Sequence, residues 1–123
     1  MNIHSLLDSV PTPSAADMAN RRQYARRYTL VFLRKGPAVL DDKTQNERIQ
    51  LEHLQHLTKL QMVGKLVLNG PTLTQHDIVG VGVYAAELED ARAMAEADPM
   101  VQAGQLIVEA IPWIAVPSDL QSG

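Results

Sequence analysis

The two histidines of the segment EHLQHL are the residues whose type and spacing best suit them to chemistry. His53 and His56 lie three positions apart, in a segment whose apolar residues Ile49, Leu57 and Leu60 recur at helical spacing. Both imidazoles therefore fall within the apolar stripe of the predicted helix and not on its solvated face. An imidazole can donate, accept or carry a proton near neutral pH, so a pair of them facing a core needs an explanation.

Metal binding is the first chemistry to test against this pair. A metal site needs at least one protein ligand more than the two histidines supply. The chain has no cysteine and no HExxH motif. His4 and His76 lie in segments that the pattern does not place beside the pair. No metal is expected.

Two other catalytic motifs are also missing. The serines lie in the terminal segments and outside any GxSxG motif, which argues against a serine hydrolase. The run GVGVY lacks the third glycine of a dinucleotide loop and lies inside a predicted strand. No cofactor is therefore expected, and proton transfer by a histidine paired with a carboxylate remains.

The elements that must position such a pair form a βαββαβ pattern. The predicted strands cover 28–33, 65–68, 78–84 and 105–111, and the predicted helices cover 42–63 and 87–97. Two helices that each join strands of one antiparallel sheet predict an α+β fold, a ferredoxin-like sandwich. The strand 78–84 is apolar on both faces, so the sheet face without helices is predicted to be buried in a homodimer or higher even oligomer.

Local signals set the ends of the two helices. Asp42 and Thr44 are candidate N-caps of the first helix, and Gly64 ends it. Pro99 ends the second helix, which places Asp98 at its end or just beyond, before a turn through 100–104.

Composition bounds the remaining possibilities. The 123 residues suffice for one domain, and the net charge of −3 makes no case for nucleic acid or an anionic membrane as a partner. No run approaches the ~18 apolar residues of a membrane span. The N-terminus lacks the pattern of a secretion signal, and the missing cysteines fit a reducing compartment, so a cytoplasmic protein is expected.

The chain is predicted to divide into three parts. Residues 1–27 form an extension, partly flexible or helical, residues 28–117 form the α+β domain, and residues 118–123 form a tail. The extension clusters four arginines, Arg21, Arg22, Arg26 and Arg27. Without interleaved aromatic residues, this cluster indicates a solvated face more than a nucleic-acid contact.

The sequence offers several carboxylates that could hold one of the histidines. Asp41, Asp42, Asp77 and Asp98 all lie near ends of predicted elements. The pattern does not fix which of them reaches the helix with the histidines. A histidine on an apolar stripe is also more often a satisfied core residue than a catalytic one.

Two segments, HLQHLTKLQMVGKLVLNGP (53–71) and ARAMAEADPMVQAG (91–104), resemble the YciI-like (YCII-related) family over about residues 28–116. The resemblance implies a dimeric α+β barrel with a histidine–aspartate pair in a small pocket, acting as a catalytic acid and base. Carried over by position, the pair is His53 and Asp98. His56 has no counterpart and is expected to be a polar residue of the helix face. The extension, the long loop 34–46 and Met100 in place of an aromatic residue depart from the family pattern.

The resulting hypothesis is a small cofactor-independent acid/base enzyme, of lyase, dehydrohalogenase, isomerase or hydrolase type, acting on a small molecule. Asn69 and Gly70 are expected to supply pocket polarity. Arg34 is a candidate for attracting an anionic substrate, although a solvated role suits it better. One alternative is a non-catalytic ligand-binding or accessory dimer, and another is a module whose Arg21–Arg27 arm docks onto another protein.

Overall fold

The structure, a computed structural model, describes residues 2–118 and divides into two compact units. Residues 27–114 form the larger unit, and the chain before and after it forms the smaller one. Within residues 2–118, no helix has the length and apolar content needed to cross a membrane. Most of the tail predicted at 118–123 lies outside the described residues.

The smaller unit contains two short helices with no buried side chains, α1 (Ile3–Asp8) and α2 (Ala15–Arg22). Ser14 begins α2 with a capping box, in which its hydroxyl accepts from the Asp17 amide while the Asp17 carboxylate accepts from the Ser14 amide. Arg21 and Arg22 lie exposed in the last turn of α2, where they complement the helix dipole.

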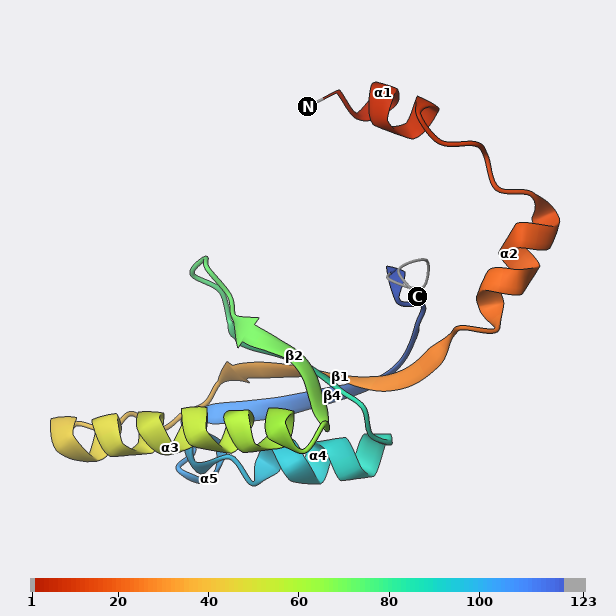
Figure 1. Cartoon of the computed structure of the whole chain (residues 1–123). Coiled ribbons are helices and arrows are strands. Elements are labelled where there is room, and N and C mark those ends of the chain that lie inside the picture. Colours follow the sequence, from red (N-terminus) through yellow and green to blue (C-terminus); the bar gives the residue numbers. More distant parts are fainter. Residues whose placement is uncertain (1, 119–123) are drawn as a thin grey trace. The chain divides into compact units, whose positions relative to one another are not determined.

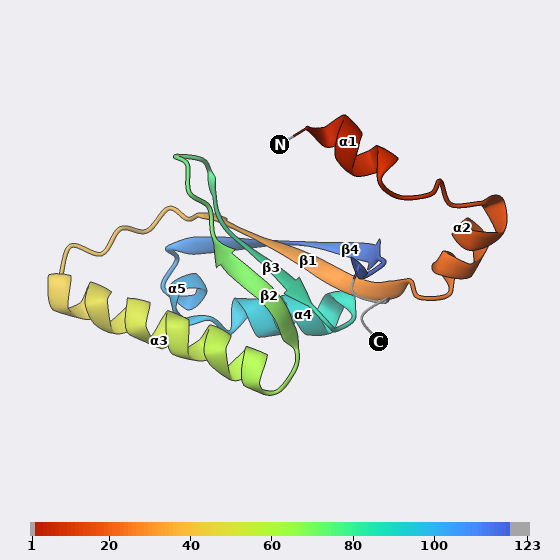
Figure 2. The same cartoon turned by 45° about the horizontal axis from the view of Figure 1, so that its top comes forward.

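The larger unit is a four-stranded sheet with three helices on one face (Figures 1 and 2). Its elements are β1 (Arg26–Lys35), α3 (Lys43–Met62), β2 (Leu66–Pro71), β3 (Ile78–Tyr84), α4 (Leu88–Glu96), α5 (Pro99–Gln102) and β4 (Leu106–Ala115). The strand order β2-β3-β1-β4 is that of a ferredoxin-like fold, so the predicted fold class is confirmed.

The alternation of side chains along β1 defines the two faces of the sheet. Thr29 and Val31 are buried toward the helices, where Val31 packs in a core with residues of β2, β3 and α4. Leu30 and Phe32 point to the opposite face and remain partly exposed. The helix-covered face therefore holds the core, and the other face carries apolar side chains without cover from this unit's helices.

A β-bulge in β2 changes which face its residues point to. Leu66 pairs with Tyr84 and Asn69 pairs with Gly82, with a shift of register between Leu66 and Leu68. Strict alternation would put residues 66 and 69 on opposite faces, but the extra residue puts both beside the helix-facing residues of β3. The bulge thus turns the polar side chain of Asn69 toward the helices.

The helix boundaries follow the capping signals, with one exception. Asp42 caps α3 by accepting a hydrogen bond of 3.1 Å from the Gln45 amide, and Gly64, with a φ of 79°, follows its end. Residues 100–102 of the predicted turn instead belong to the short helix α5, because Pro99 suits a first helical position and Asp98 caps it, and residues 103–104 form the turn.

The last strand is longer than predicted. β4 does not end at Ile111 but continues through Pro112 and Trp113 to Ala115. β4 is an edge strand, with a neighbouring strand on one side only. Such a strand tolerates a proline, which has no amide hydrogen to donate.

Candidate active site

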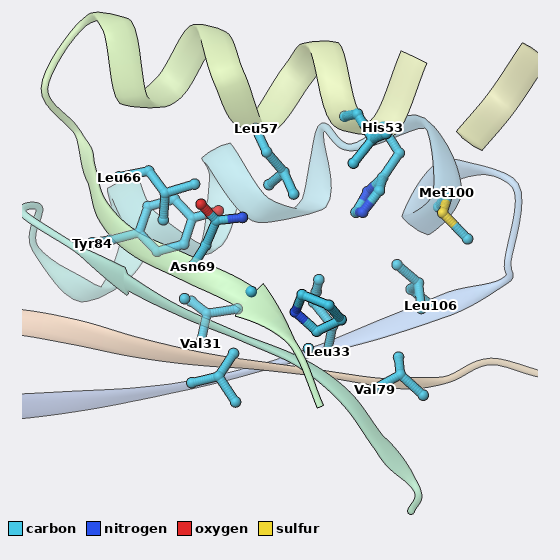
Figure 3. A pocket seen from close by; sticks show the side chains of 16 residues that line it. Val31, Leu33, His53, Leu57, Leu66, Asn69, Val79, Tyr84, Met100 and Leu106 are labelled. Atoms are coloured by element: carbon cyan, nitrogen blue, oxygen red, sulfur yellow. The ribbon is translucent and has the colours of Figure 1, made fainter. Parts of the chain in front are cut away.

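A cavity of about 270 Å³ lies between α3, α5 and the helix-facing side of the sheet (Figure 3). Val31, Leu33, Leu57, Leu66 and Leu106 make most of its wall apolar. The polar side chains in the wall are His53 from α3, Asn69 from β2 and Tyr84 from β3. A concave, mainly apolar space with a few polar groups is the usual form of a small-molecule site.

Two glycines of β3 keep this space open in different ways. A Cβ atom on Gly82 would lie 3.3 Å from both Leu66 Cδ1 and Tyr84 Cε1, so the missing side chain makes room for the Tyr84 ring. A Cβ atom on Gly80 would lie 3.5 Å from Leu33 Cδ1, an ordinary contact, so Gly80 leaves part of the cavity floor empty. The alternating glycines thus have a structural reason in the sheet.

His53 and Asp98 form the shortest polar contact of the pocket wall. The distance from His53 Nδ1 to Asp98 Oδ2 is 2.5 Å. A carboxylate can only accept, so Nδ1–H is the donor and the neutral ring keeps its lone pair on Nε2. Among residues 2–118 no hydrogen bond to Nε2 is formed, and the ring lines the cavity. The arrangement leaves a proton acceptor on a ring that lines the cavity.

The position of Asp98 explains how this contact is maintained. Its side chain is 2% exposed, and its second oxygen, Oδ1, accepts from the Met100 amide at 2.8 Å. Asp98 is therefore both the N-cap of α5 and the partner of His53. A buried carboxylate is costly unless its oxygens are satisfied, and here each oxygen has a donor.

His56 has a different partner and a different role from His53. Its Nε2 lies 2.8 Å from the Met94 carbonyl oxygen, so Nε2–H donates a hydrogen bond that joins α3 to α4. The two imidazoles thus engage different groups and do not converge on one point. Within residues 2–118, no three histidine, aspartate or glutamate side chains cluster in a way that would hold a metal ion.

The other residues singled out from the sequence lie in two different places. Asn69 and Gly70 line the cavity. Arg34 does not line it, and its guanidinium instead contacts Asp77 at 2.7 Å and Glu109 at 2.8 Å. Hydrogen bonds to these two carboxylates raise the pKa of Arg34. Arg34 is thus engaged in an ion-pair network and does not offer a charge to the cavity.

Tyr84 is a pocket residue that the sequence analysis did not single out. Its side chain is buried, and desolvation, with a smaller effect of the Asp98 charge, raises the pKa of its phenol to about 12. Tyr84 is consequently a neutral hydroxyl at physiological pH. The signal in the sequence is the pair of glycines before it, Gly80 and Gly82, which leave space on one face of the strand but do not identify the ring that fills it.

Replacing Tyr84 by phenylalanine tests this environment through the pH dependence of stability. The phenol ionises near pH 10 in the unfolded chain but only near pH 12 in the fold, so between these values the unfolded state releases a proton first. From pH 9 to pH 11.5, the free energy of unfolding of the wild type should therefore decrease. We expect this decrease to exceed that of Tyr84→Phe by on the order of 2 kcal/mol.

Chemical denaturation at both pH values measures this difference, and Tyr24→Phe, which removes an exposed phenol, is the matched control. If the free energy of unfolding decreased equally in the wild type and in Tyr84→Phe, the Tyr84 hydroxyl would not be desolvated in the fold.

A solved structure shares this fold at low sequence identity. A search of curated proteins gave no match. The 5-chloro-2-hydroxyhydroquinone dehydrochlorinase TftG from Burkholderia phenoliruptrix AC1100, solved with 2,5-dihydroxybenzoquinone, is similar with a TM-score of 0.50 and 20% identity, over 70% of this chain and 90% of that one. The RPA0582 protein of unknown function from Rhodopseudomonas palustris is 17% identical over 86% of this chain and 95% of that one, with a TM-score of 0.35.

The family comparison covers the whole ferredoxin-like unit. The YCII-related domain matches residues 27–114, which include the cavity wall and both members of the histidine–aspartate pair. At 20% identity, the likeness to the dehydrochlorinase is a likeness of fold alone. The match covers most of the sequence, and this chain belongs to the YCII-related domain family.

Proposed function

We propose that this protein is a small acid/base enzyme that acts on a small molecule without a cofactor, in a reaction of lyase, dehydrohalogenase or hydrolase type. The observation that carries the proposal is the contact of 2.5 Å between His53 Nδ1 and Asp98 Oδ2, in the wall of an apolar cavity. A histidine with one nitrogen held by a carboxylate and the other directed to a ligand is the arrangement of a general base.

The roles of the two residues follow from their geometry. His53 accepts a proton at Nε2 from the bound molecule and returns it to the product or to water. Asp98 keeps the hydrogen on Nδ1 before the transfer and stabilises the imidazolium that forms after it. A positioned general base of this kind contributes about 10²- to 10⁴-fold to a rate.

Dehydrochlorination suits such a site because it removes a proton and chloride and needs no electron carrier. The TftG neighbour is named as a dehydrochlorinase of 5-chloro-2-hydroxyhydroquinone, and its likeness to this chain supports the choice of the first compound to test. The proposal for this chain depends on its own pair and cavity, and the substrate is sought among small molecules with an acidic hydrogen.

The competing function is a ligand-binding or accessory module without catalysis. The mainly apolar wall with three polar side chains also suits binding alone. Turnover separates the two functions, because a binding module retains its ligand unchanged.

Replacing His53 by glutamine is the test of the enzymatic proposal. We expect the wild type to release chloride from 5-chloro-2-hydroxyhydroquinone, or to catalyse hydrogen–deuterium exchange in at least one of a panel of small carbon acids. NMR follows the exchange. His53→Gln should lower that rate at least about 100-fold, because glutamine does not take up a proton at neutral pH.

His76→Gln is the matched control, since His76 lies outside the cavity wall and accepts from the Ile78 amide. A His53→Gln rate equal to the wild type would contradict the proposal, and ligand binding without turnover across the panel would favour the binding module.

We further propose that the protein is a homodimer or a higher even oligomer formed through the open sheet face. On this face Leu30 and Phe32 of β1 lie beside Val81 and Val83 of β3, with Ile107 of β4 at 49% exposure. Apolar side chains on three strands of one uncovered sheet face are of the kind that marks an interface. A second copy presents the same patch, so the contact is self-complementary.

A charge placed in this patch tests the oligomer. Phe32→Glu should convert the dimer to a monomer in sedimentation velocity at micromolar concentration, because association would bury a carboxylate without a partner. Met62→Glu is the control, since Met62 is 79% exposed at the end of α3, on the helix side. A monomeric wild type, or a Phe32→Glu protein that remains dimeric, would contradict this assembly.

A further inference from the structure

The charge of the cavity wall restricts what the cavity binds. Among the described residues, no lysine, arginine, aspartate or glutamate lines it, and His53 and Tyr84 are its titratable groups. Asp98, the acidic group that contacts a wall residue, is bonded to His53 and to the Met100 amide. Arg34, the candidate cation, is bound to Asp77 and Glu109 instead. An anionic ligand would find no fixed positive charge there.

The cost of desolvation then discriminates between ligands. An ionised carboxylate loses its hydration on entering an apolar cavity, and without a cation this loss costs several kcal/mol. A neutral carbonyl or hydroxyl group loses less hydration free energy on entering the cavity, and one or two hydrogen bonds to the wall compensate for that loss. The apolar wall therefore favours an uncharged molecule over an anion of the same shape.

The polar groups of the wall occupy two separate positions. In Figure 3, Tyr84 and Asn69 lie on one side of the cavity, and His53 lies apart from them near Met100. Tyr84 and Asn69 meet around Gly82, where a Cβ atom would lie 3.3 Å from Tyr84 Cε1 and 3.9 Å from Asn69 Cβ. The cavity thus has a proton-accepting end and a hydrogen-bonding end.

The hydrogen-bonding end is suited to an oxygen acceptor. Burial and the Asp98 charge, not a hydrogen bond, account for the raised pKa of Tyr84, so its hydroxyl remains a donor at physiological pH. The amide of Asn69 can donate as well. Two neutral donors beside an apolar wall recognise a carbonyl or hydroxyl oxygen.

We propose that the cavity binds an uncharged, mainly apolar molecule of about ten non-hydrogen atoms, whose oxygen accepts hydrogen bonds from Tyr84 and Asn69 while its reactive hydrogen faces His53. The size follows from the cavity of about 270 Å³, filled at ordinary packing density. The reactive end rests on the proposed function of His53, whereas the ligand class rests on the wall alone and is tested by binding.

Benzamide and benzoate form a matched pair of probes, because they share a ring and a planar head group and differ in charge. Titration of the ¹⁵N-labelled full-length protein at pH 8 should shift the amide signals of Gly80 and Gly82 with benzamide. We expect benzoate to bind at least about tenfold more weakly, since it must be desolvated without a counter-charge.

Two variants locate the ligand within the cavity. Tyr84→Phe keeps the ring and removes the donor, so benzamide affinity should fall about five- to tenfold. Gly80→Ala adds a methyl group in ordinary contact with Leu33 and narrows the cavity, so benzamide affinity should fall as well. Tyr28→Phe, outside the cavity wall, should leave the affinity unchanged.

Three results would each overturn the proposed ligand class. They are benzoate binding as tight as that of benzamide, an unchanged benzamide affinity in Tyr84→Phe, and no shift of the Gly80 and Gly82 amide signals with either probe. Loss of turnover in His53→Gln supports the catalytic proposal whatever the probes show, so failure of the ligand class is distinguishable from failure of the enzyme.

Discussion

The buried carboxylate of Asp98 is the group on which the geometry of the site depends. One oxygen caps α5 and the other holds His53, so a single side chain sets the start of one helix and the ring orientation on another. Moving this carboxylate out of water is costly, and both donors are needed to compensate for it. The fold therefore favours the arrangement in which Nδ1 of His53 is bound and Nε2 is left for a ligand.

The shape of the cavity depends on backbone features as much as on side chains. The bulge in β2 turns Asn69 toward the helices, and Gly82 makes room for the Tyr84 ring beside it. These features place two neutral donors in a wall that is otherwise apolar. The pocket thus combines a proton acceptor at one end with hydrogen-bond donors at the other, which links the proposed chemistry to the proposed ligand class.

Periodicity and capping residues were enough to predict the fold and the helix that carries His53. They were not enough for three features that depend on tertiary contacts. The register that brings Asp98 to His53 followed only from the family resemblance, because several carboxylates lay near element ends. Tyr84 was missed because its burial depends on the space left by Gly82 and on packing in the core. The ion pairs of Arg34 with Asp77 and Glu109 could not be predicted, because these two residues lie far from Arg34 in the sequence and beside it only in the fold.

The ¹⁵N chemical shifts of the His53 ring test the central claim most directly, since they report which nitrogen carries the hydrogen. Under conditions where the ring is neutral, we predict a protonated Nδ1 and an unprotonated Nε2 in the wild type. Asp98→Asn, which retains a cap for α5, should yield a mixture of the two forms. A wild-type ring with its hydrogen on Nε2, or shifts that are the same in Asp98→Asn, would show that Asp98 does not orient His53 as a proton acceptor for the cavity.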